Sequence, residues 1–128
     1  MRSLKTLAAL LGVGVFTTVG VAETEKTEQA VIVNFDYGSK DWNQFFAFEK
    51  GFESAVNASG LGDYDGNELA VDGSDGSMYM YGPDADRLFA FVRPRLEAAA
   101  FLKHVRVTLR YGSVDDPKAR EVVVKLGS

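Results

Sequence analysis

Two kinds of hydrophobic periodicity alternate along this chain, and their order limits the folds that it can adopt. In some segments every second side chain is apolar, which is typical of strands with one buried face. In others, apolar side chains recur at every third or fourth position, as on the buried side of a helix. Asp41 is the expected N-cap of the first helix, and Gly60 is expected to end it. The expected strands are 29–37, 67–71, 77–81, 104–111 and 119–126, and the expected helices are 41–57 and 83–101.

This order of elements is βαββαβ with one extra strand at the C-terminal end. Two helices with apolar stripes need one sheet face to cover, which predicts an α+β, ferredoxin-like two-layer sandwich. The periodicity assigns side chains from both layers to a single core. The predicted core residues are Val31, Val33, Phe35, Phe45, Phe48, Phe52, Leu88, Val92, Leu96, Val105, Val107 and Leu109.

The first residues carry the features of an export signal. Arg2 and Lys5 precede an apolar run, and Gly20 and Ala22 place small side chains where a signal peptidase cuts. We therefore expect an exported protein, periplasmic or secreted. A retained signal would instead tether the domain to a membrane. The expected division is a signal-peptide helix at residues 1–22, a disordered spacer at 23–28 and the α+β domain at 29–128.

Charge and cysteine content narrow the range of functions. The chain has 14 Lys and Arg against 18 Asp and Glu, and loss of Arg2 and Lys5 with the signal would make it more acidic. This balance argues against nucleic acid and anionic membranes as partners. The chain contains no cysteine, so disulfides cannot stabilise it. Its nine Phe, five Tyr and one Trp must supply the stabilising packing instead.

Three segments of the second half resemble a widespread family of small bacterial domains of unknown function. These segments are Asp65-Gly66-Asn67-Glu68, Tyr79-Met80-Tyr81-Gly82-Pro83-Asp84-Ala85-Asp86 and Leu109-Arg110-Tyr111-Gly112. The resemblance spans residues 62–126 and implies the same ferredoxin-like architecture. It implies no activity and no catalytic residue.

The residues capable of metal binding or catalysis do not form a recognisable set. An acidic cluster could offer oxygen ligands to calcium, but Gly66 and Ser74 occupy positions that do not fit an EF-hand loop. His104 is the single histidine, and without cysteine it cannot complete a zinc site. No serine elbow accompanies it as part of a catalytic triad. We therefore predict no catalytic residue, no metal and no cofactor. The acidic cluster comprises Asp63, Asp65, Asn67, Glu68, Asp72 and Asp75.

Tyrosine and arginine residues are expected together on the side of the sheet away from the helices. Tyr79 and Tyr81 share one face of the third strand, and Arg106 and Arg110 share one face of the fourth. Both residue types are enriched at binding hot spots, whereas cross-strand pairing on a solvated face would explain them equally well. Our hypothesis is a non-enzymatic module that binds a protein partner, or self-associates, through this open face. A further hypothesis is that these residues bind an anion on the open face.

The alternative hypothesis is a small dimeric enzyme whose substrate cavity lies between two paired open faces, as in monooxygenase-type ferredoxin-like barrels. Trp42, Asn34 and His104 could line such a cavity, with His104 as acid or base. Two other ferredoxin-like activities lack their signature residues. An acylphosphatase-type site needs an arginine after the first strand, where this chain offers only Lys40, and a metal-chaperone site needs a Cys-x-x-Cys motif.

Overall fold

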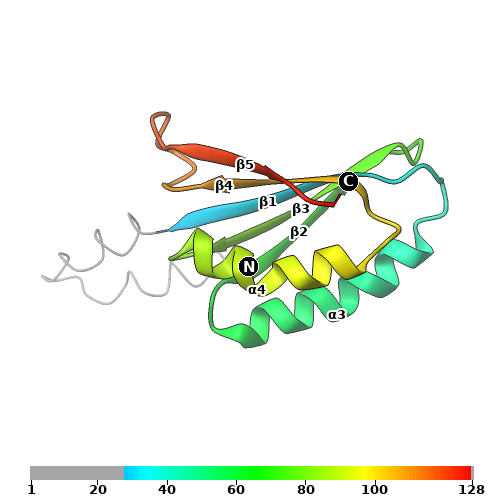
Figure 1. Ribbon diagram of the computed structural model, residues 1–128, viewed down its shortest axis with the longest axis horizontal. Helices are drawn as coiled ribbons and strands as arrows, with labels where there is room; N and C mark the ends of the chain where they lie inside the picture. Colours follow the sequence, from blue (N-terminus) through cyan, green and yellow to red (C-terminus); the bar gives the residue numbers. More distant parts are fainter. Residues whose placement is uncertain (1–27, 128) are drawn as a thin grey trace, which may run out of the picture.

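Both helices lie on the same side of one antiparallel five-stranded sheet (Figure 1). The computed structural model describes residues 28–127, and the expected α+β class is confirmed there. The predicted signal peptide, with its helix, and nearly all of the spacer lie outside the described residues. The elements are β1 (Gln29–Asp36), α3 (Asn43–Ser59), β2 (Asp63–Leu69), β3 (Asp75–Gly82), α4 (Ala85–Ala98), β4 (Lys103–Arg110) and β5 (Glu121–Lys125).

The strands follow the order β2-β3-β1-β4-β5 across the sheet. Each helix crosses over one strand: α3 connects β1 to β2 past β3, and α4 connects β3 to β4 past β1. The order differs from that of a simple ferredoxin-like fold, because β5 lies outside β4. The two edges of the sheet are therefore β2 and β5.

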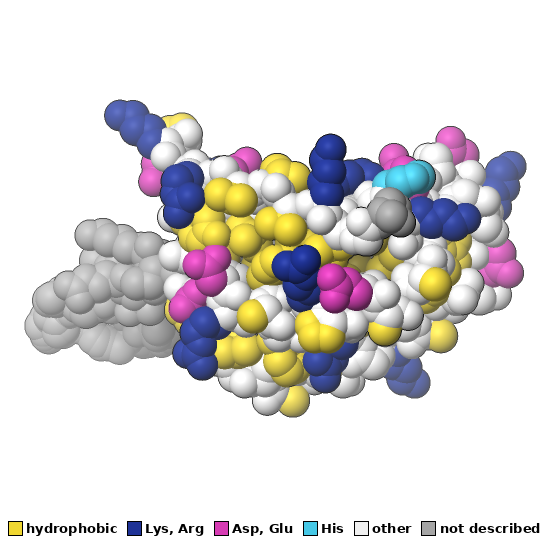
Figure 2. Space-filling view, in the orientation of Figure 1, with side chains coloured by type: hydrophobic (Ala, Val, Ile, Leu, Met, Phe, Trp, Pro, Cys, Tyr) yellow, Lys and Arg dark blue, Asp and Glu magenta, His cyan; other side chains and the backbone are white. Residues whose placement is uncertain are grey.

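The core lies between the helices and alternate side chains of the central strands. Of the twelve predicted core residues, all but Phe48 are buried, and Phe48 packs against the cluster while half-exposed. Met78, Met80 and Tyr64 also belong to the core. The sequence patterns of their segments did not predict that these side chains are buried. The helices leave the β5 side of the sheet less covered, and Figure 2 shows hydrophobic side chains at the surface between α4 and β5.

The expected N-cap of the first helix is wrong by one residue. Trp42 takes the N-cap position of α3 without a capping side-chain bond. Asp41 still contributes, because its Oδ1 accepts a hydrogen bond from the backbone N of Asn43 at 2.9 Å. The indole of Trp42 stacks on Tyr37, with ring centroids 4.1 Å apart, and this packing fixes the entry of the chain into the helix.

Helix α4 begins two residues later and ends three residues earlier than expected. The Asp84 carboxylate caps it by accepting a hydrogen bond from the backbone N of Arg87. The last helical residue is Ala98, whereas the sequence suggested an end near Phe101. Within residues 28–127, neither helix has the length and apolar character needed to cross a membrane.

The second strand begins four residues before its expected start at Asn67. Tyr64 and Asn67 both pair with β3, but the register shifts between them. Gly66 lies in this bulge with φ of +100°, a conformation that a side chain would strain. The extra residue breaks the two-residue alternation, so this part of β2 has the sequence pattern of a turn.

Candidate functional site

The face of the sheet opposite the helices is open within residues 28–127 (Figure 1). The strand register arranges its side chains in three rows that cross the sheet. The first row is Asp63, Tyr81, Ala30, Arg110 and Glu121; the middle row is Tyr79, Ile32, Thr108 and Val123; the third row is Glu68, Ser77, Asn34, Arg106 and Lys125. All four predicted site residues therefore lie on this face.

The middle row is mostly apolar. Ile32, Tyr79 and Thr108 are half-buried, and Val123 is 58 % exposed. The Tyr79 hydroxyl donates to Glu68 Oε1 at 2.6 Å, and this bond raises the pKa of the phenol. The tyrosine ring is thus held over the sheet with its polar end directed to the edge strand.

Arg110 holds a loop rather than presenting its charge to solvent. Its Nη1 donates to Glu121 Oε2 at 2.7 Å, and its Nη2 donates to the carbonyl oxygens of Ser113 at 3.2 Å and Asp116 at 2.5 Å. Its side chain is only 17 % exposed. These bonds anchor residues 112–118 over one end of the open face, so we assign Arg110 a structural role.

Tyr81 lies beside Ala30 and close to this loop. Ala30 is 1 % exposed, because larger neighbours shield it on the otherwise open face. Tyr81 also helps to line a hollow of about 160 Å³, together with Asp65 and residues 112–114. The hollow is too small for most organic ligands, whose sites usually span about 300–1,000 Å³.

An ionic cluster occupies the opposite end of the open face. Asp36 Oδ2 shares a hydrogen bond with His104 Nδ1 at 2.8 Å, and Asp36 Oδ1 accepts from Arg106 Nη1 at 3.3 Å. The bond from His104, with help from Arg106, lowers the pKa of Asp36. Arg106 Nη1 also donates to the backbone carbonyl of His104 at 2.7 Å. Arg106 therefore already has an acidic partner and a backbone acceptor, which weakens the hypothesis of an anion site on this face.

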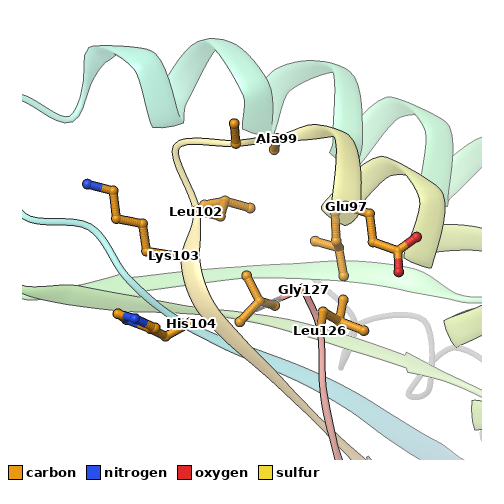
Figure 3. A pocket seen from close by; sticks show the side chains of 10 residues that line it. Glu97, Ala99, Leu102, Lys103, His104, Leu126 and Gly127 are labelled. Atoms are coloured by element: carbon orange, nitrogen blue, oxygen red, sulfur yellow. The ribbon is translucent and has the colours of Figure 1, made fainter.

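His104 has the backbone strain that often accompanies functional residues. Its φ is +51°, a left-handed value that few residues other than glycine adopt. A hollow of about 270 Å³ lies beside it, between the end of α4 and the start of β4. In Figure 3, Leu102 and Leu126 turn into this hollow, whereas Lys103 and His104 extend away from it.

The structure does not bring together the three residues that were expected to line an enzyme cavity. Trp42 packs against the core on the helix side, where its ring contacts Phe35 and Tyr37. Asn34 lies on the open face and accepts a hydrogen bond from the Ser77 hydroxyl. The sheet separates Trp42 from Asn34, so no single cavity includes both with His104.

The acidic cluster is divided between the two sides of β2. Asn67 turns toward the helices, and its Nδ2 donates to Glu49 Oε2 at 2.6 Å. Glu68 lies on the open face beside Tyr79. Among residues 28–127, no group of three or more His, Cys, Asp or Glu side chains is placed to hold a metal ion.

No match was found when the chain was compared with protein-family models, curated proteins and solved structures. The sequence predicted that Tyr79, Tyr81, Arg106 and Arg110 share this face, but it did not single out Asp36, which bonds His104 and Arg106 at the ionic end. The alternation of β1 was the available signal, since it places Asp36 on the same face as Asn34.

Proposed function

We propose that this chain is an exported, non-enzymatic protein-binding module and that the open face of its sheet is the binding surface. The observation that carries the proposal is the middle row, in which Ile32, Tyr79 and Val123 present apolar surface to solvent. Binding surfaces typically combine such an apolar centre with a polar rim. Here the ionic cluster around Asp36 lies at one end of the face, and the loop held by Arg110 lies at the other.

The finer description of the fold belongs to this proposal. The order β2-β3-β1-β4, with both crossover helices on one face, supports a ferredoxin-like core to which β5 is added. Export is supported by the charged and apolar pattern of residues 1–22. The partner would then be a protein of the periplasm or of the cell's surroundings.

Photo-crosslinking at Thr108 tests the proposal, because this residue lies in the middle row. A photoreactive amino acid is placed there in the full chain, and the exported protein is irradiated in its native host. We expect one dominant protein adduct, which the double variant Tyr79→Ser, Arg106→Ala reduces at least tenfold while the protein remains folded at the temperature of the experiment. The matched control is Phe46→Ser, Arg93→Ala, which removes an exposed aromatic and an arginine from the helix side. Equal loss of the adduct in both variants would reject the open face as the binding surface.

The dimeric-enzyme alternative retains one supporting observation, the hydrogen bond that orients the His104 ring against Asp36. In that alternative two open faces pair around a substrate. The same crosslinker at Thr108 would then join two copies of this chain instead of joining it to a different protein. Adducts of the chain with itself would therefore favour self-association, the arrangement that the enzyme alternative requires, over binding of a different protein.

A further inference from the structure

The two edges of the sheet differ in their protection against pairing with another strand. Edge strand β2 carries a bulge at Gly66 and the acidic side chains Asp63, Asp65 and Glu68. Bulges and charges of this kind keep edge strands from associating. Edge strand β5 has neither a bulge nor a proline, and its register with β4 is unbroken from Glu121 to Lys125.

The phase of the hydrogen bonds shows which groups of β5 face outward. The backbone N of Tyr111 donates to the carbonyl of Arg120, and that of Leu126 donates to the carbonyl of Val105, both at 2.9 Å. Antiparallel strands alternate between bonded and non-bonded pairs, so Val122 and Val124 direct their backbone groups toward β4. The remaining residues, Glu121, Val123 and Lys125, direct theirs away from the sheet.

The side chains of β5 also suit association. Val122 is 36 % exposed on the helix side, and Val123 is 58 % exposed on the open face. Figure 2 shows that hydrophobic side chains remain at the surface between α4 and β5. A short run of exposed valines at an unprotected edge favours addition of another strand.

The charges at the two ends of β5 indicate which strand can be added there, namely β5 of a second copy of this chain. When two copies of the strand pair antiparallel about an axis midway between their Val123 residues, Glu121 of each copy lies opposite Lys125 of the other. Sliding the strands by two residues removes both of these pairs. Sliding them by four places like charges opposite each other. The strand is therefore complementary to itself in one register.

We propose that two copies of this chain pair through β5 and form one continuous antiparallel sheet. The outward backbone groups of Glu121, Val123 and Lys125 supply the main-chain hydrogen bonds between the copies. Because the two-fold axis is perpendicular to the sheet, both open faces lie on the same side of the dimer. The proposal goes beyond the binding face, since it concerns the edge of the sheet and stands without it. A contact of five residues is small, so the dimer dissociates in about the micromolar to millimolar range.

Charge reversal at the two ends of β5 tests the proposal. The full chain is purified after expression in an exporting host and is followed by sedimentation equilibrium up to about 1 mM. Lys125→Glu and Glu121→Lys each place like charges opposite each other, so each variant alone should show at least a tenfold higher dissociation constant. Glu121→Lys also removes the bond to Arg110 within its own chain, so Lys125→Glu is the single variant that decides the test. In an equimolar mixture every altered end meets an opposite charge, and heterodimers should recover the original affinity.

The controls separate dimerisation from folding. Lys125→Glu places an acid opposite Arg106 within the same chain, so it should leave the melting temperature unchanged or raise it. Val123→Pro removes only an outward N–H and should also abolish pairing. Glu68→Lys makes the same charge change on the other edge and should have no effect on the dissociation constant. A chain that stays monomeric up to 1 mM, single variants that dimerise like the original, or a mixture that fails to recover would each overturn the proposal.

Discussion

The hydroxyl of Tyr64 donates to Glu49 Oε2 at 2.6 Å, which ties edge strand β2 to helix α3. The same oxygen accepts a bond from Asn67 Nδ2. Tyr64 is 8 % exposed, and its burial, together with the bond to Glu49, raises the pKa of the phenol. The hydroxyl therefore remains a donor at any ordinary pH. This contact fixes the strand whose bulge interrupts the sequence pattern.

Removal of this hydroxyl should cost more than removal of a similar one on the surface. We expect Tyr64→Phe to lower the free energy of unfolding by about 1–2 kcal/mol, because a buried bond to a carboxylate is lost. Tyr79→Phe removes a bond of the same length to Glu68, but this bond is exposed to solvent, so the loss should change the free energy of unfolding by less than about 0.5 kcal/mol. Urea unfolding of both variants measures the difference. Equal losses would show that burial does not strengthen the Tyr64 contact.

Two glycines should respond in opposite directions to alanine. Gly73 has φ of +78°, and a Cβ there would overlap the backbone of Ser39 and Lys40, so Gly73→Ala should destabilise the protein by about 2 kcal/mol or more. Gly51 lies inside α3 with open space around its Cα, so Gly51→Ala should stabilise by about 0.5–1 kcal/mol. Thermal and urea unfolding provide the measurement. A neutral Gly73→Ala would mean that the turn can separate from Ser39.

Arg110 should control the order of the loop that it holds. Arg110→Lys keeps the charge beside Glu121 but cannot bridge the carbonyls of Ser113 and Asp116 together. We expect trypsin to cleave after Lys118 about tenfold faster in this variant, since the loop opens more often. Arg106→Lys, at the other end of the face, serves as the matched control and should leave this rate unchanged. Equal cleavage rates in the original chain and in both variants would show that Arg110 does not hold this loop in place.

The sequence predicted best those helices and strands whose hydrophobic pattern depends only on residues close together in the chain. Helical and strand periodicities depend on neighbouring residues, so both helices and the strictly alternating β4 are found close to their expected ranges. Strand β2 was shortened in prediction because Gly66 and its neighbouring aspartates resemble a turn. Phe48 has the helical spacing of a core residue, but it lies at the border of the buried stripe and stays half-exposed.

The open face could be predicted as a location but not as a set of contacts. Alternation alone placed Tyr79, Tyr81 and both arginines on it. It could not show that Arg110 is occupied by loop carbonyls, because loop geometry leaves no periodic signal. Nor could it pair Asp36 with His104, which lies 68 positions later in the chain. Such pairs depend on the strand order, which emerges only when the sheet is assembled.

The ionic cluster at the end of the open face should make the free energy of unfolding depend on pH in the acid range. The pKa of Asp36 lies below its ordinary value of 3.8, because the charged form is hydrogen-bonded by His104 and Arg106. A carboxyl with a lowered pKa stabilises the fold above its unfolded pKa, and this contribution is lost as pH falls through the folded pKa. The difference in unfolding free energy between the original chain and Asp36→Asn should therefore be constant near neutral pH and shrink below about pH 4.

The two partners of Asp36 should contribute unequally to this acid dependence. The hydrogen bond from His104 lowers the Asp36 pKa more than the bond from Arg106 does. We therefore expect His104→Phe to remove the larger part of the pH dependence and Arg106→Met the smaller part. Denaturant unfolding between about pH 2.5 and 7 measures both variants, and the Asp36→Asn protein gives the limit of complete loss. If Arg106→Met alone abolished the dependence, the carboxylate would be held by the arginine, and the 2.8 Å contact with His104 would contribute little to the stability of this end of the sheet.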